Sequence, residues 1–129
     1  MLYKQNQSYE LDEKLFKNPT SEYRAAPFWA WNCKLNKDIL NEQIDIFKKM
    51  GFGGFHMHSR IGMSTPYLKD EFMGLIKFCT QKAEQENMLA YLYDEDRWPS
   101  GSAGGYVTKT HKYRQRCLIF SQNSREHFS

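Results

Sequence analysis

Hydrophobic and polar residues follow two different periods along the chain, and together these predict three strands and two helices. Short apolar and aromatic runs at 27–32, 52–58 and 89–94 have the length and residue types of β-strands. Between them, apolar residues recur at i, i+4 and i+7 over 37–50 and 67–86, which is the period of an amphipathic helix. The chain is therefore predicted to alternate strand and helix.

Capping residues indicate where the two helices begin and end. Asn36 has the side chain of an N-cap, and Gly51 stands where a left-handed residue would end the first helix. Thr65 and Pro66 are predicted to be the N-cap and first residue of the second helix, and Asn87 its left-handed terminator.

The connections are too long for hairpins, so the strands are predicted to be parallel, with right-handed helical crossovers. The expected fold class is α/β, a partial (β/α)8 TIM barrel of three βα units, because a complete barrel needs about 250 residues and this chain has 129. We divide it into an N-terminal arm (1–26), the partial barrel domain (27–121) and a C-terminal tail (122–129). Residues 116–121 are a candidate fourth strand, and the chain reads as the N-terminal part of a longer protein.

Charge and composition narrow the classes of partner. The net charge is +3, and acids lie among the basic residues, so the mild excess at 109–116 predicts a solvated face and no nucleic-acid partner. No apolar run reaches the roughly 18 residues of a membrane span. The three cysteines form no CxxC motif, which favours a reducing compartment, and we expect a cytoplasmic protein.

Parallel strands end at one edge of a sheet, which is where α/β proteins bind ligands. Here that edge would gather tryptophan rings that can stack on sugars and polar side chains that can orient hydroxyls. We therefore expect a carbohydrate substrate, and the candidate substrate-binding residues are Trp29, Trp31, Asn32, His58, Arg60, Asp96 and Trp98. Trp29 and Trp31 share one face of their strand, and the alternative is that they fill the core.

Three consecutive acids follow the third strand. Asp94 and Glu95 are the candidate catalytic carboxylates, while Asp96 is assigned to substrate binding. Two other interpretations stay open: a calcium site, which needs several oxygen ligands, or an ion pair between one acid and a nearby arginine. His56 and His58 have the spacing of a strand-borne metal pair, but no third histidine or cysteine is near, so we expect no zinc site.

Four motifs resemble a known family in their order and spacing. They are Pro27–Asn32 (PFWAWN), Met50–Arg60 (MGFGGFHMHSR), Thr65–Leu68 (TPYL) and Tyr93–Gly101 (YDEDRWPSG). They resemble the start of the barrel domain in bacterial glycoside hydrolases similar to family 106, the α-L-rhamnosidases. The resemblance covers about residues 22–120 and implies a TIM barrel, hydrolysis of a glycosidic bond and a calcium-assisted inverting mechanism.

Two departures from the family limit what the resemblance implies. Its members are many times longer, and both catalytic carboxylates cannot be matched here. We therefore expect a glycoside hydrolase fragment that is inactive alone and self-associates through open sheet edges. The rivals are a non-catalytic α/β module that binds a carbohydrate or a protein, and a small flavodoxin-like domain.

Overall fold

The structure is a computed structural model that describes residues 9–97, 101–118 and 120. Its elements, in chain order, are α1 (Glu13–Lys17), the 3-10 turn η1 (Ser21–Tyr23), β1 (Phe28–Trp31), α2 (Lys37–Lys49), β2 (Gly54–Ser59), α3 (Asp70–Gln85), β3 (Leu89–Asp96) and the 3-10 turn η2 (His111–Tyr113). From β1 to β3 the chain alternates strand and helix, as the hydrophobic pattern predicts.

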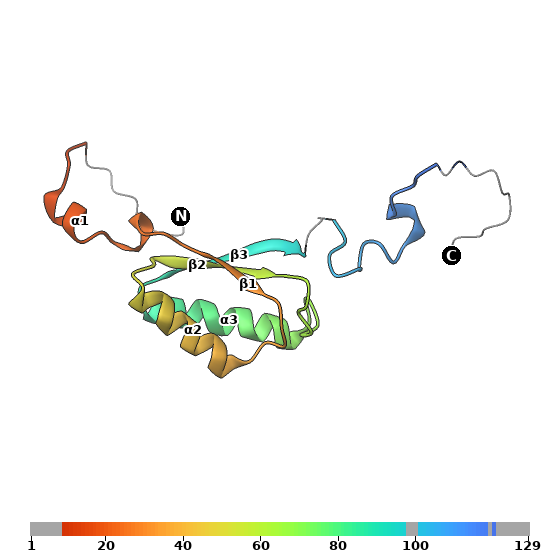
Figure 1. Cartoon of the computed structure of the whole chain (residues 1–129), viewed down its shortest axis with the longest axis horizontal. Helices are drawn as coiled ribbons and strands as arrows, with labels where there is room; N and C mark the ends of the chain where they lie inside the picture. The colour runs from red at the N-terminus through yellow and green to blue at the C-terminus, as the bar shows by residue number, and fades with distance from the viewer. Residues whose placement is uncertain (1–8, 98–100, 119, 121–129) are drawn as a thin grey trace.

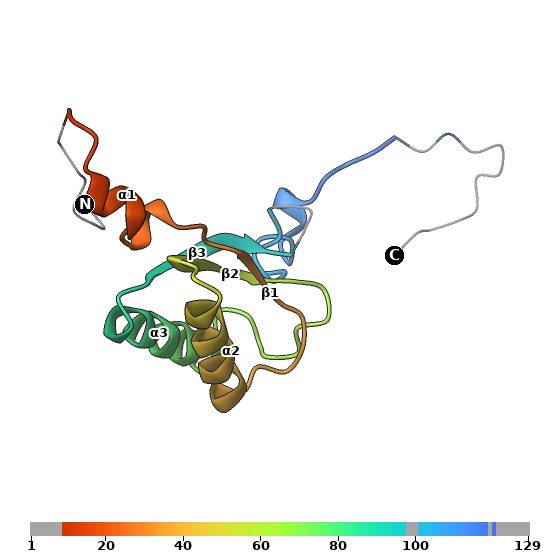
Figure 2. The same cartoon turned by 60° about the vertical axis from the view of Figure 1, so that its left-hand side comes forward.

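The three strands form one open parallel sheet in the order β1-β2-β3. Both crossover helices lie on the same face of the sheet, as the two views in Figure 1 and Figure 2 show. The predicted α/β class and the parallel pairing of the strands are confirmed. Three parallel strands joined by helical crossovers are what a run of βα units gives. Among the described residues, no further strand pairs with the outer edge of β1 or of β3.

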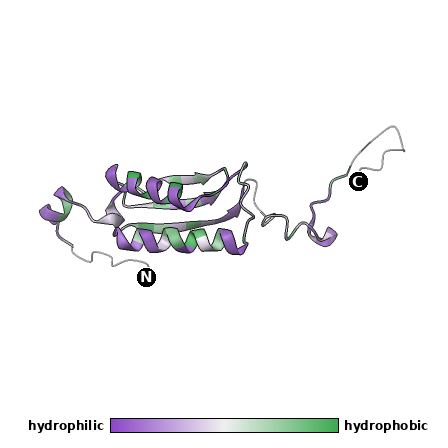
Figure 3. Ribbon diagram, turned by 90° about the horizontal axis from the view of Figure 1, so that it is seen from below, coloured by the Kyte–Doolittle hydropathy of each residue, from purple (hydrophilic) through white to green (hydrophobic). Residues whose placement is uncertain are grey.

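Helix α2, the first of the two predicted helices, has the ends that the sequence predicts. The Asn36 side chain accepts hydrogen bonds from the backbone amides of Asp38 and Ile39, at 2.9 and 3.1 Å, which satisfies two of the helix's unpaired donors. Gly51 follows the helix with a φ of +84°. Leu40 and Ile44 are the buried residues of its apolar stripe. Figure 3 shows this mixture of hydrophobic and hydrophilic positions on both helices.

Helix α3, the second of the two predicted helices, begins later than predicted. It starts at Asp70 with Lys69 as N-cap, so the assignment of Thr65 and Pro66 to its first turn is wrong. Thr65 is 1% exposed, and its hydroxyl accepts a hydrogen bond of 2.9 Å from the backbone amide of Leu35. Its cap-like residue type therefore serves a contact between two loops. The predicted terminator Asn87 is confirmed, with a φ of +54°.

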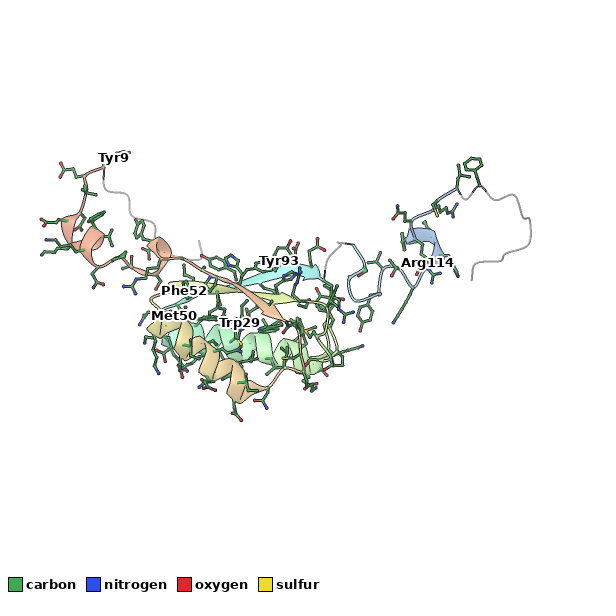
Figure 4. The ribbon with its side chains drawn as sticks, in the orientation of Figure 1. Tyr9, Trp29, Met50, Phe52, Tyr93 and Arg114 are labelled. Carbon is green, nitrogen blue, oxygen red and sulfur yellow. The ribbon has the colours of Figure 1, made fainter. Side chains whose placement is uncertain are left out.

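Aromatic rings fill the core between the sheet and the helices. The rings of Trp29 and Phe55 meet edge to face with 5.2 Å between centroids, and those of Trp31 and Phe72 with 5.8 Å. Figure 4 shows Trp29 on the helix side of the sheet and Tyr93 on the opposite side. Among the described residues, four aromatic side chains thus belong to the buried core: Trp29, Trp31, Phe55 and Phe72.

The opposite face of the sheet carries a second group of rings, and no described helix covers it. His58 lies between Phe28 and Tyr93, with ring centroids 4.4 and 4.3 Å away, and the His56 ring stacks on Tyr91 at 4.5 Å. In a closed barrel this face would point inward.

The N-terminal arm is attached at the amino end of the sheet. The Gly53 amide donates a 3.0 Å hydrogen bond to the Ala25 carbonyl, and the Ser21 hydroxyl donates one to the Asn87 carbonyl. A Cβ on Gly53 would lie 1.9 Å from the Ser21 carbonyl oxygen. Only glycine permits this approach between the arm and β2.

The C-terminal predictions fall partly outside the described residues. In the candidate fourth strand, residues 116–118 and 120 are not strand, and the other two residues are not described. The tail at 122–129 is also outside the described part. Within the described residues, no helix has the length and apolar character that crossing a membrane requires.

Candidate functional site

The ends of the three strands meet at the carboxyl edge of the sheet. The Arg60 amide donates a hydrogen bond of 2.8 Å to the Trp31 carbonyl, and the Arg97 amide donates one of 3.2 Å to the Ser59 carbonyl. These bonds join the end of β1 to β2 and the end of β2 to β3. The residues that follow each strand, predicted to share one rim, are thus brought to the same edge.

A close backbone contact fixes the loop after β2 over the end of β1. Gly62 has a φ of +103°, and a Cβ there would lie 2.5 Å from the Asn32 carbonyl oxygen. Asn32 is exposed and Arg60 is half-buried beside this contact. Both side chains therefore belong to the rim.

The pairing of β3 with β2 changes register where the acids begin. Met57 pairs with Leu92, but Ser59 pairs with Asp96, so two steps along β2 correspond to four along β3. Tyr93, Asp94 and Glu95 lie inside this irregularity. Bulges of this kind redirect side chains at the ends of strands and occur beside active sites. Simple strand alternation therefore does not describe how the three acids are arranged.

Asp96 is the buried member of the three acids, at 5% exposure. Its Oδ1 accepts a hydrogen bond of 3.2 Å from the Ser59 hydroxyl and lies 3.6 Å from Nε of Arg97. This is the ion pair with a neighbouring arginine that the sequence left open for one of the acids.

Asp94 and Glu95 differ from Asp96 in having carboxylates without a hydrogen-bonded or ion-paired partner among the described residues. Asp94 is exposed and Glu95 is half-buried. Their backbone carbonyls are engaged, because Asp94 accepts from the Tyr67 hydroxyl at 3.4 Å and Glu95 from the Ser59 hydroxyl at 3.1 Å. The backbone of this segment is thus held by hydrogen bonds that do not involve either carboxylate.

His58 is the buried polar residue of the open face. It is 3% exposed, and within the described residues neither ring nitrogen has a hydrogen-bond partner. Burial lowers its pKa, and the charge of Arg60 lowers it further, whereas Glu95 and Asp96 act in the opposite direction. The lowered pKa favours the neutral form of the ring, whose two nitrogens have no hydrogen-bond partner among the described residues.

The structure places both predicted sugar-stacking tryptophans in the core. Trp29 is 7% and Trp31 2% exposed, and Nε1 of Trp29 donates a 2.9 Å hydrogen bond to Gln43. Their faces are covered by other side chains, which is the alternative that the sequence left open, so neither ring belongs to the rim. Trp98 lies outside the described residues.

A cavity of about 230 Å³ lies beside the rim, between the loop after β2 and the segment after β3. Its lining residues are Met63, Ser64, Thr65, Pro66, Tyr67, Asp96, Arg97, Gly104 and Tyr106. The sequence did not single out Tyr67 or Tyr106 as site residues. In the structure Gly104 approaches Tyr67 closely, with a φ of +65° and a Cβ that would lie 2.9 Å from the Tyr67 ring.

The described residues contain no group of three or more histidine, cysteine, aspartate or glutamate side chains that could hold a metal ion. The calcium ion that the resemblance implies therefore has no cluster of three acidic side chains to bind it in the part of the chain that the structure describes.

Comparison with known proteins gives a similarity to a solved structure. No family model matches the chain, and no curated protein matches it. A solved structure of a rhamnosidase from Novosphingobium sp. PP1Y is similar, with a TM-score of 0.58 and 23% sequence identity. The similarity covers 67% of this chain and 9% of that chain. At this identity it shows a shared fold, and this chain corresponds to a small part of that protein.

Proposed function

We propose that this chain forms three βα units of a TIM-barrel glycoside hydrolase, and that its carboxyl edge binds a sugar of the α-L-rhamnoside type. The observation that carries the proposal is the convergence of Asn32, Arg60, Asp94 and Glu95 at one edge, where both carboxylates have no hydrogen-bonded or ion-paired partner in the part of the chain that the structure describes. The fold that the chain shares with part of a rhamnosidase structure supports it.

The rim offers the polar groups that a sugar needs. The carboxylates of Asp94 and Glu95 accept hydrogen bonds from hydroxyl groups, while Asn32 and Arg60 donate them. Tyr93, half-buried on the open face, offers an aromatic ring beside these groups. In this proposal Tyr93 takes the stacking role first assigned to the tryptophans.

Hydrolysis needs more than this rim provides. An inverting glycosidase uses an acid and a base about 6.5–9.5 Å apart on opposite sides of the glycosidic bond. Asp94 and Glu95 are consecutive residues of β3, so they supply one side of that pair. The opposite carboxylate would come from the far side of a closed barrel. We therefore expect this chain to bind the sugar weakly and not to cleave it.

The experiment is a titration of the purified chain with methyl α-L-rhamnoside, followed by saturation-transfer NMR, together with an assay on an aryl α-L-rhamnoside. The proposal predicts saturation transfer that Arg60→Gln weakens, and no turnover. Turnover by the chain would contradict the one-sided carboxylate arrangement, and absence of saturation transfer would contradict the binding site.

A second function, a binding module for another protein chain, is favoured by the unpaired edges of β1 and β3. Leu92 pairs with Met57 in register and so lies on the helix side, yet Leu92 is 50% exposed while Met57 is 1% exposed. Unpaired strand edges can pair with a strand of another chain, and uncovered apolar side chains favour association between chains. We expect the chain to self-associate through these edges, and a monodisperse monomer by light scattering would contradict this.

A further inference from the structure

The cavity beside the rim lies directly beyond the proposed sugar site. Asp96 and Arg97 line it, and they follow Glu95 in sequence, so the end of β3 separates the cavity from the carboxylates of the rim. Its volume of about 230 Å³ is below the roughly 300–1,000 Å³ of pockets for drug-sized ligands. A single sugar ring is a ligand of suitable size.

Two ammonium groups lie close to one of the rings that line this cavity. Nζ of Lys69 lies 5.3 Å and Nζ of Lys109 4.8 Å from the centroid of the Tyr106 ring, and Tyr106 lines the cavity. Both lysines are drawn to the electron-rich ring face. Among the described residues, neither forms an ion pair with a carboxylate, whereas the lysines that do so lie elsewhere: Lys17, Lys34, Lys48 and Lys82.

The acid inside the cavity does not offset these two charges, because it has its own cation. Nε of Arg97 lies 3.6 Å from Oδ1 of Asp96, and Nη2 of Arg97 donates a 3.4 Å hydrogen bond to the Met63 carbonyl. The pair is held in place by the loop after β2. The two lysines therefore place two ammonium groups, without an ion-paired carboxylate among the described residues, next to the Tyr106 ring that lines the cavity.

We propose that the cavity is a second sugar subsite, and that it takes a hexuronate ring whose carboxylate is bound by Lys69 and Lys109. Asp96 and the Tyr67 hydroxyl would bind its hydroxyl groups. The inference rests on the proposed function, because it places this ring next to the sugar at the rim. The substrate is then an acidic oligosaccharide.

The test compares methyl β-D-glucuronide with methyl β-D-glucoside, which differ at the carboxylate, by NMR titration of the amides of Gly104 and Tyr106. The glucuronide should shift the NMR resonances of both amides, and the glucoside should bind more weakly. Added salt should weaken the binding of the glucuronide, since the contact between its carboxylate and the two lysines is ionic and exposed.

Variants separate the two lysines from general charge effects. Replacing both, Lys69→Gln and Lys109→Gln, should weaken glucuronide binding about three- to tenfold, as expected for exposed ion pairs. Lys112→Gln is the matched control, because its Nζ lies 5.7 Å from the centroid of a different ring, that of Tyr113, which does not line the cavity. Gly104→Ala, which places a methyl group against Tyr67, should also weaken binding.

The outcomes distinguish this inference from the proposed function. Equal binding of glucoside and glucuronide, or no effect of the double lysine variant, overturns the inference. If methyl α-L-rhamnoside binds at the rim and the glucuronide does not bind, the inference alone is overturned. If the glucuronide binds and the rhamnoside does not, the cavity is supported and the proposed rim site is overturned.

Discussion

Ser59 and Asp96 face each other across β2 and β3, and the Ser59 hydroxyl donates a hydrogen bond of 3.2 Å to the buried carboxylate of Asp96. The same hydroxyl is 3.1 Å from the Glu95 carbonyl. The pair re-establishes the register of the two strands after the irregularity at Tyr93–Glu95. It thereby positions the segment that carries the candidate carboxylates.

Removing this hydroxyl should destabilise the fold. Ser59→Ala leaves a buried carboxylate with one partner fewer, and we expect a loss of about 1–3 kcal/mol in the free energy of unfolding. Urea denaturation measures it. Ser64→Ala, an exposed serine in the neighbouring loop, is the control and should change stability by less than about 0.5 kcal/mol. Equal effects of the two variants would contradict the role of Ser59.

Replacing each of two glycines by alanine should change the free energy of unfolding in opposite directions. Gly53→Ala places a Cβ 1.9 Å from the Ser21 carbonyl oxygen, so the arm must move and stability should fall. Gly74 lies within α3, and a Cβ there meets nothing within 4 Å. Gly74→Ala should raise the free energy of unfolding by about 0.5–1 kcal/mol, through helix propensity and a less flexible unfolded chain. Urea denaturation of both variants tests this, and two changes of the same sign would contradict it.

His58 should make stability depend on pH below about 6.5, its unfolded pKa. Burial lowers the pKa of His58 in the folded protein, so the unfolded chain binds its proton first as the pH falls. Stability is therefore present above about pH 6.5 and declines as the pH falls toward the lower folded pKa. His58→Phe should flatten this dependence, and the exposed His111→Gln should not. Parallel pH profiles for wild type and His58→Phe would show the idea wrong.

A group of ion pairs between α2 and α3 should stabilise the fold at neutral pH and should lose this effect at low pH. Lys82 pairs with Asp45 at 2.9 Å and with Glu86 at 2.8 Å, and Lys48 also pairs with Glu86. Hydrogen bonds from Lys48 and Lys82 lower the pKa of Glu86 to about 2. The contribution of Glu86 to the free energy of unfolding is present above its ordinary pKa of 4.5 and is lost as the pH falls toward 2.

The matching variant is Glu86→Gln, which should lower stability at neutral pH and leave stability at about pH 2 close to wild type. Thermal unfolding at both pH values measures the difference. Glu71→Gln is the control, because its pair with Lys34 joins two exposed side chains and such pairs contribute little. A Glu86→Gln effect as large at low pH as at neutral pH would contradict the ionic origin.

The parallel sheet and both helices were predictable from the sequence because they depend on local period and capping. The Asn36 cap and the Gly51 and Asn87 ends need only neighbouring residues. Thr65 was misassigned because its hydroxyl serves Leu35, 30 residues away in sequence, a contact that no local pattern reveals.

The site was only partly predictable for the same physical reason. That strand ends share an edge follows from topology, so the rim positions of Asn32 and Arg60 could be expected. The register shift before Asp96 and the ion pair inside the cavity depend on packing between loops. Whether Trp31 faces a ligand or the core depends on which face of β1 the helices cover, and a strand's sequence alone does not specify that.

The central claim is that the carboxyl edge binds a sugar through Asp94 and Glu95. Backbone-amide NMR titration of the chain with methyl α-L-rhamnoside tests it most directly, alongside the double variant Asp94→Asn, Glu95→Gln. The variant keeps the shape of both side chains and removes their charge. Ser64→Ala, which alters the loop but not the carboxylates, is the control.

The account predicts shifts at Asn32, Arg60 and Asp94 in the wild type and in Ser64→Ala. In the double variant, with an unchanged spectrum elsewhere, binding should weaken about tenfold or more, as expected for losing hydrogen bonds to charged groups. No shifts at these residues in the wild type, or equal affinity in the double variant, would contradict the account.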